Sequence, residues 1–217
     1  MSTRCSVVVA ILASFVVASA GAAEARVPLV WTDPAGAAVG LDAVAREEAR
    51  SLLEKMGVAV AWRRENAGSL ARAGEVRVIL LDRGAERGPG TPVLGATPPR
   101  FQVGPFVWVH VPNVRAAIGL SPRGPVASIE APMARALGIA IGRVVAHEVV
   151  HALAPAVPHG RGLMSASLGR SQLTASSIAI EESVLLSVQA ALRGDPLLPP
   201  SEPGALAAAV DGEDLRR

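Results

Sequence analysis

The stretch VVAHEVVHALAPAVPHGRGLM, residues 144–164, holds three of the four histidines in the chain. Two of them belong to the sequence HEVVH at residues 147–151, which is an HExxH motif. Residues four apart on an α-helix lie one above the other, so His147 and His151 are placed to bind one metal ion. Glu148 lies one step round the helix, where its carboxylate reaches a water molecule at that metal. The motif therefore predicts a zinc site with an adjacent general base.

A coincidental match is the alternative, because a histidine on an apolar helix is usually a structural residue. The residues around the motif are largely apolar, from Val144 to Leu153. Two imidazoles and a carboxylate buried there without partners would cost free energy, and a bound metal ion removes much of that cost. We therefore favour the metal site over a chance occurrence of the motif.

Residues 1–25 have the pattern of a secretory signal peptide. Arg4 supplies the positive charge, Val7–Ala18 is the apolar segment, and cleavage sites of the AxA type follow at residues 18–20 and 23–25. The apolar segment is too short to span a bilayer comfortably, which disfavours the alternative of an uncleaved membrane anchor. We therefore expect a secreted or periplasmic protein that keeps no stable membrane span after cleavage.

Composition limits the other possibilities. The chain has 217 residues, 50% of them hydrophobic, and a net charge of +2, which suit one compact domain. No basic run or aromatic-interleaved patch indicates a nucleic-acid partner. The single cysteine, Cys5, would leave with the signal peptide, so zinc would have to be bound by His, Asp or Glu. We expect a single domain over residues 26–196 and a flexible tail over residues 197–217.

Hydrophobic periodicity predicts an α+β fold. A first strand or lead-in is expected at Val27–Trp31, followed by strands at Val58–Arg64, Glu75–Asp82 and Phe106–Val111. Helices are expected at Leu41–Met56, Ala131–Leu153 and Ile178–Leu192. The architecture would be a small twisted mixed sheet of about three to five strands. It would pack on a backing helix and on the helix that carries the motif, with a C-terminal helix added.

Two further expectations concern the surroundings of the motif helix. This helix is apolar nearly all round, which predicts that it is buried. Gly138 and Gly142 within it are expected to allow close backbone packing, against the sheet. The segment Arg83–Gln102 contains several Gly and Pro residues and no periodicity, which predicts a long exposed connection without secondary structure.

Beyond HExxH, the chain continues with His159 and with the sequence Gly162-Leu163-Met164. With these residues it resembles the metzincin branch of the zincin metallopeptidases, which combine HExxH with a third histidine and a methionine turn below the metal. It is more closely similar to a group of predicted secreted bacterial metallopeptidases, over roughly Val93 to Leu192. The resemblance implies a zincin-like fold, a zinc site formed by three histidines, and Met164 as its structural floor.

The third zinc ligand is open between two kinds of residue. Glu181 and Glu182 lie on the expected C-terminal helix, where gluzincins, another zincin branch, carry a ligand glutamate. We favour His147, His151 and His159 as the metal ligands, because His159 is followed by the Gly-Leu-Met sequence of the similar group. The two glutamates would then be an exposed pair at a helix start, or one would orient a ligand histidine.

The chain departs from the metzincin pattern in two ways. Metzincins place the third histidine six residues after the second, with a glycine at the bend. Here the gap is eight residues and Pro155 stands where the similar bacterial group has a glycine, so the chain must bend without a positive φ there. The chain also has no tyrosine, which excludes the tyrosine that some of these enzymes place near the metal. Arg161 and His110 are the candidates for stabilising an oxyanion, and the alternative for His110 is a hydrogen-bonded residue of the sheet.

These expectations lead to a secreted zinc endopeptidase that hydrolyses a peptide or protein substrate. Glu148 would take a proton from the attacking water and pass it to the leaving amine. An extended substrate would pair with the strand Phe106–Val111. The alternative is a non-catalytic secreted zinc-binding or envelope interaction domain, although a structural site has no need for a general base. The sequence gives no cleavage preference, strand order or oligomeric state.

Overall fold

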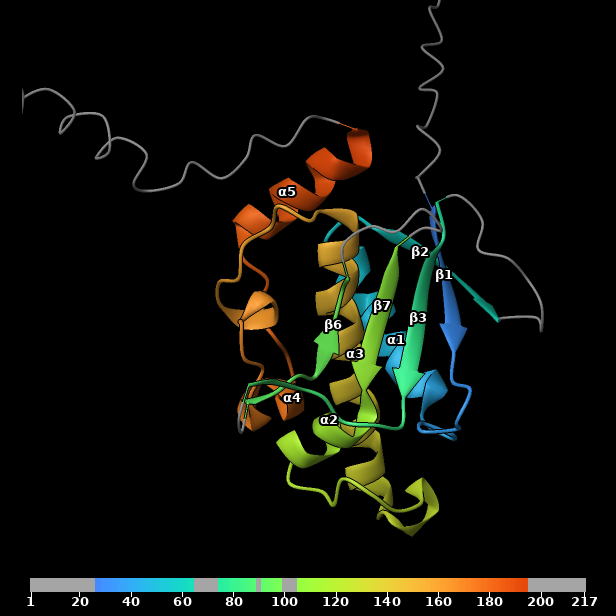
Figure 1. Ribbon diagram of the computed structural model, residues 1–217. Coiled ribbons are helices and arrows are strands. Elements are labelled where there is room, and N and C mark those ends of the chain that lie inside the picture. Colours follow the sequence, from blue (N-terminus) through green and yellow to red (C-terminus); the bar gives the residue numbers. More distant parts are fainter. Residues whose placement is uncertain (1–25, 65–73, 89–90, 99–104, 195–217) are drawn as a thin grey trace, which may run out of the picture.

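The chain forms a mixed α+β fold around one five-stranded, mostly parallel sheet (Figure 1). The computed structural model describes residues 26–64, 74–88, 91–98 and 105–194. The expected signal peptide over residues 1–25 and the expected tail over residues 197–217 lie outside the described residues. The α+β class predicted from hydrophobic periodicity is therefore confirmed for the part of the chain that is described.

The sheet has the strand order β2-β1-β3-β7-β6. Its strands are β1 (Arg26–Thr32), β2 (Ala59–Arg64), β3 (Val76–Leu81), β6 (Gly95–Ala96) and β7 (Phe106–His110). Strands β2, β1, β3 and β7 run parallel. At the edge, β6 pairs antiparallel with β7, Gly95 opposite Val109 and Ala96 opposite Trp108. The four predicted strands are confirmed, including the lead-in segment, which is β1.

Two long helices, α1 (Asp42–Lys55) and α3 (Ala131–Leu153), cover one face of the sheet (Figure 1). The other helical segments are α2 (Val111–Ala117), α4 (Arg170–Thr174), α5 (Glu182–Arg193) and the 3-10 turns Val126–Ser128 and Gly162–Met164. Prolines mark both ends of α3, because Pro132 lies in its first turn and Pro155 is the second residue after its end. Helix α5 begins four residues later than the periodicity indicated.

The hydrophobic core lies between the sheet and these two long helices. Alternate strand residues enter it, such as Val107 and Val109 of β7, which are both fully buried. Helix α3 is buried almost continuously from Leu137 to Val150, as its apolar surface predicted. It is long and apolar enough to cross a membrane, but most of that stretch is enclosed by the protein, as in a core helix.

The close approach of α1 and α3 depends on two glycines of α3. A Cβ on Gly142 would lie 2.5 Å from the carbonyl oxygen of Ala45 and 2.8 Å from the Cβ of Glu48. A Cβ on Gly138 would lie 2.9 Å from the side chain of Val44. These separations are too short for carbon atoms in contact. The glycines therefore permit close packing, as expected, but the partner is α1 and not the sheet.

A buried arginine ties α3 to α1 and α4. Arg143 is 1% exposed, and its Nε donates to the Glu48 carboxylate at 2.8 Å. Its two terminal nitrogens donate to the carbonyl oxygens of Gln172 and Ala175. A buried guanidinium is stable only when partners of this kind satisfy its N–H groups. The network thereby holds the segment around α4 beside the helix that carries the motif.

The segment Arg83–Gln102 differs from the unstructured connection that the sequence predicted. Strands β4 (Glu86–Gly88) and β5 (Thr91–Pro92) form an antiparallel pair, and the edge strand β6 follows them. These strands are too short for an alternating pattern to show in the sequence. Strand β7 lies between β3 and β6, so the expected pairing of a substrate with Phe106–Val111 does not fit this sheet.

Replacement of Gly142 with alanine tests the packing of the two helices. Alanine in a helix interior normally adds about 1 kcal/mol of stability relative to glycine, but here its Cβ would collide with α1. We expect Gly142→Ala to lower the free energy of unfolding by about 1–3 kcal/mol in urea or thermal unfolding. Gly88→Ala is the control, because nothing lies within 4 Å of its added Cβ. Equal stability of Gly142→Ala and the wild type would contradict the close packing.

Candidate metal centre

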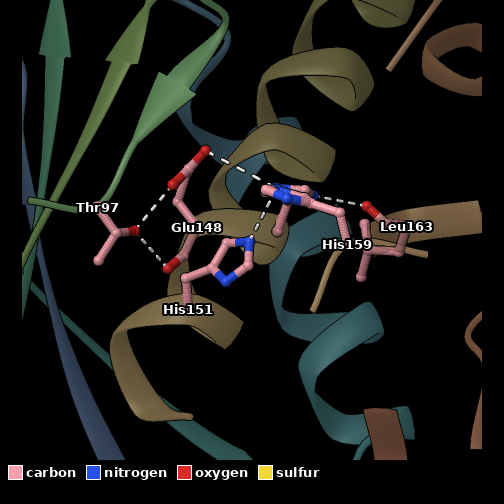
Figure 2. Close-up of polar contacts among 6 residues, drawn as sticks. Thr97, Glu148, His151, His159 and Leu163 are labelled. Atoms are coloured by element: carbon pink, nitrogen blue, oxygen red, sulfur yellow. Dashed lines mark hydrogen bonds and ion pairs between the residues drawn. The ribbon is translucent and has the colours of Figure 1, made fainter. Parts of the chain in front are cut away.

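Three histidines meet at one point of the structure. His147 and His151 lie one turn apart near the end of α3, and His159 comes from the segment that follows (Figure 2). One ring nitrogen of each lies within 4.8 Å of the others, and His151 Nε2 is 3.2 Å from His159 Nε2. Within the described ranges, this is the one group of His, Cys, Asp or Glu side chains arranged to hold a metal ion.

The chain bends sharply after α3 to bring His159 back to the helix. Helix α3 ends at Leu153, Ala154 leaves the helical conformation, and the amide of Val157 donates to the Ala154 carbonyl at 3.0 Å. No residue between Leu153 and His159 has a positive φ. This turn therefore accommodates Pro155, which stands where the similar bacterial group has a glycine.

A backbone carbonyl holds the ring of His147. Its Nδ1–H donates to the carbonyl oxygen of Leu163 at 2.7 Å, which leaves Nε2 as the nitrogen that can bind a metal. The amide of Leu163 in turn donates to the carbonyl of Ala179 at 2.8 Å. Gly162 has a φ of +59°, and a Cβ there would lie 2.1 Å from the same carbonyl oxygen, so this position requires glycine. Met164, the next residue after Leu163, is fully buried.

The carboxylate of Glu148 lies beside the histidines, on the side of strand β6. Its Oε1 is 4.0 Å from His147 Nε2, and its Oε2 is 2.8 Å from the Thr97 hydroxyl oxygen (Figure 2). That hydroxyl also lies 2.8 Å from the carbonyl oxygen of Glu148, and its single proton serves one acceptor at a time. A Cβ on Gly95 would lie 2.7 Å from Glu148 Cγ. Strand β6 and the residue after it therefore fix the position of the carboxylate.

Burial shifts the protonation of these groups in opposite directions. Desolvation lowers the pKa of His147 below its ordinary 6.5, and desolvation with repulsion from the neighbouring histidines lowers that of His151 to about 4. Desolvation raises the pKa of Glu148 from 4.5 to about 7, against the opposing effects of the Thr97 hydrogen bond and the charge of Arg87. Both helix histidines are therefore neutral at neutral pH, the state in which imidazole binds a metal.

The geometry fits a metal ion with nitrogen ligands. A tetrahedral ion bound at about 2.0–2.1 Å from each nitrogen holds those nitrogens roughly 3.3 Å apart. The separation of 3.2 Å between His151 and His159 is close to this value. The ring nitrogen of His147 lies within 4.8 Å of them, so a shift on the order of 1 Å completes the set.

The structure also separates the candidates for the third ligand. His159 belongs to the group, whereas neither Glu181 nor Glu182 does. Glu181 precedes α5 and lies against the backbone near the site, since a Cβ on Gly160 would be 2.3 Å from its Oε2. Glu182 is exposed in the first turn of α5. Neither glutamate is therefore placed as a ligand of a metal ion at the three histidines.

Two cavities adjoin at the site. They share Arg87, Gly95, Glu148 and His159 in their walls. One has a volume of about 300 Å³ and continues past residues 165–169. The other has a volume of about 400 Å³ and continues along the residues after Gly95 towards the bend that follows α3. Because the walls are shared, a ligand that extends from one cavity into the other passes Glu148.

Neither predicted oxyanion candidate lines these cavities. His110 is buried, and its Nδ1–H donates to the carbonyl of Arg83 at 2.9 Å. It is therefore a hydrogen-bonded residue of the sheet, which was the alternative expected for it. Arg161 is exposed and is absent from both walls. The cation that does reach the site is Arg87, which the sequence did not single out. Thr97 lies within the stretch from Val93 to Leu192 that is similar to the bacterial group, whereas Arg87 precedes this stretch, so the sequence held no signal for Arg87.

The raised pKa of Glu148 predicts how the stability of the metal-free protein depends on pH. The unfolded carboxyl ionises at its ordinary pKa of 4.5, whereas the folded carboxyl ionises at about 7. Its stabilising contribution is therefore complete below pH 4.5 and is lost as the pH rises to about 7. Above that pH, the ionised buried group lowers the free energy of unfolding by roughly 3 kcal/mol.

Comparison with Glu148→Gln isolates this effect, because the variant cannot ionise and both proteins keep the same histidines. We expect similar unfolding free energies near pH 4.5, the ordinary pKa of the carboxyl. Near pH 8 we expect the variant to be more stable by roughly 3 kcal/mol. Urea unfolding of the two metal-free proteins measures the difference. A difference that stays constant across this pH range would contradict the buried position of Glu148.

Comparisons with known proteins add no assignment. No protein family model, curated protein or solved structure matches this chain. Among the features that the resemblance to metzincins implies, the structure supports the group of three histidines, which fits a metal ion. The function therefore has to be inferred from the geometry of this group, of Glu148 and of the two cavities.

Proposed function

We propose that the chain is a secreted zinc-dependent endopeptidase with a metzincin-like domain of the zincin type. The observation that carries this proposal is the convergence of His147, His151 and His159 beside the buried carboxylate of Glu148, in a cleft. Closed structural zinc sites use four protein ligands, whereas three ligands beside a carboxylate are typical of sites that activate water. Residues 1–25 have the pattern of a signal peptide, which supports secretion.

Zinc is the metal proposed for this site, because HExxH is typical of zinc hydrolases. Three imidazoles form the site, and such nitrogen ligands suit zinc. When bound, zinc supplies Lewis acidity, which lowers the pKa of a water molecule and polarises a substrate carbonyl. The chain contributes ligands that are ready to bind, since burial keeps His147 and His151 unprotonated at neutral pH. The carbonyl of Leu163 orients the ring of His147 for this purpose.

Glu148 is the proposed general base. The hydroxyl of Thr97 and the close approach of Gly95 hold its carboxylate in one position relative to the histidines. Its pKa of about 7 suits a group that takes a proton from water and returns it to the leaving amine, because such a base works best near the ambient pH. A cation at the three histidines would lower this pKa and favour the carboxylate form.

The cleft supports an extended peptide as the substrate. Strand β6 (Gly95–Ala96) forms part of the cavity wall and is the last strand at its end of the described sheet. An extended peptide adds to such an edge through backbone hydrogen bonds. A peptide placed along β6 would pass from one cavity to the other and bring a carbonyl group close to Glu148. This path replaces the expected pairing with β7.

The test is hydrolysis of fluorescently labelled casein by the zinc-loaded mature protein and by Glu148→Gln. We expect the variant to keep its metal, because the three histidines are intact, and to lose at least about 100-fold in rate. Glu182→Gln is the control, because it removes an exposed carboxylate outside both cavities and should keep wild-type activity. Equal rates for Glu148→Gln and the wild type would overturn the proposal. Zinc binding without hydrolysis of any peptide would instead favour the non-catalytic zinc-binding domain.

A further inference from the structure

A hairpin that carries an exposed arginine borders the cleft. Strands β4 and β5 pair antiparallel, and Arg87 is the middle residue of β4. Its side chain is exposed to solvent and lines both cavities, together with Glu148 and His159. Arg87 therefore lies at the rim where the cavities adjoin, near enough to Glu148 for its charge to act on that carboxylate.

The base of this hairpin is fixed to neighbouring elements. Asn113 of α2 donates from Nδ2 to the carbonyl oxygens of Ala85, at 2.6 Å, and Val93, at 2.8 Å. The amide of Val93 donates to the Ala85 carbonyl at 2.9 Å, and the ring of His110 donates to the Arg83 carbonyl at 2.9 Å. These hydrogen bonds order the hairpin base before a ligand binds, which lowers the entropy cost of recognition by its arginine.

Apart from the proposed zinc ion, Arg87 is the one fixed positive charge among the described residues that line the cleft. Among the described residues that line the two cavities, Arg87 is the only Arg or Lys, and Glu148 is the only Asp or Glu. No ion pair joins Arg87 to another described residue. At the rim, away from the proposed zinc ion, a substrate carboxylate thus meets one guanidinium, and Glu148 is the one acidic side chain of the described lining that repels it.

We propose that Arg87 selects peptides with an acidic side chain close to the scissile bond, an inference that rests on the proposed peptidase function. A guanidinium binds a carboxylate through two parallel N–H···O hydrogen bonds, a match that an amide or an alkyl group does not provide. Because Arg87 shares both cavity walls with Glu148, it contacts substrate residues next to the reacting carbonyl and not those at the distant ends. The same charge offsets the repulsion between the substrate carboxylate and Glu148.

The test uses pairs of fluorogenic peptides that differ only by Glu or Gln at one position near the scissile bond. For the wild type we expect kcat/KM to be about tenfold higher for the Glu peptide at one such position. Arg87→Ala should abolish this ratio, and Arg87→Glu should favour a matched Lys peptide instead. Arg135→Ala removes an exposed arginine of α3 outside both cavities, so it should keep the wild-type ratio.

Peptide binding to the zinc-loaded Glu148→Gln protein, measured by calorimetry, gives a result that does not depend on turnover. The Glu peptide should bind about tenfold more tightly than the Gln peptide, and Arg87→Ala in the same background should remove the difference. Hydrolysis at equal rates for both peptides would overturn the selectivity and leave the peptidase proposal in place. Binding that depends on Arg87, without hydrolysis by the wild type, would support the selectivity and overturn the peptidase.

Discussion

Helix α3 is buried on nearly every side and yet carries two imidazoles and a carboxylate near its end. Polar groups in such a position are stable only with partners outside the helix, and the surrounding chain supplies them. The carbonyl of Leu163 receives the His147 N–H, and the Thr97 hydroxyl binds the Glu148 carboxylate. These partners come from segments on either side of α3 in the sequence. The fold thus supplies hydrogen-bond partners for a small group of polar side chains inside an apolar core.

This arrangement links metal binding to stability. The burial that keeps His147 and His151 neutral also raises the pKa of Glu148, so the metal-free site holds a carboxylate that is poorly solvated at neutral pH. A divalent cation at the histidines compensates for this, because it attracts the carboxylate and binds the neutral rings. Occupancy of the site should therefore stabilise the fold by an amount that rises with the logarithm of the metal affinity. Folding and the proposed chemistry depend on the same few groups.

Local sequence patterns predicted the parts of the structure that depend on short-range periodicity. The spacing of His147 and His151 placed two imidazoles on one helix face, and apolar periodicity located α1 and α3. The position of His159 depends on a turn that contains Pro155 and no positive φ, which the sequence alone did not define. The structure brings this histidine, and not a downstream glutamate, to the helix.

Features that depend on long-range packing were not predictable in the same way. Gly142 indicated close packing, but only the tertiary structure shows α1 as the partner. Arg143 gives no sequence signal that distinguishes it from a surface arginine, although it is buried and hydrogen-bonded. Gly95, Thr97 and Arg87 lie in or beside strands of two or three residues, too short to produce a hydrophobic period. The surroundings of Glu148 therefore became visible only in three dimensions.

The proposed function requires that His147, His151 and His159 together bind one zinc ion. Elemental analysis of the purified mature protein, beside His159→Ala and Glu182→Ala, tests it most directly. We predict about one zinc per chain in the wild type and in Glu182→Ala, with loss of zinc in His159→Ala. Zinc that is retained in His159→Ala and lost in Glu182→Ala would contradict the three-histidine site. Absence of zinc from the wild type after reconstitution would contradict both the metal site and the peptidase function proposed for it.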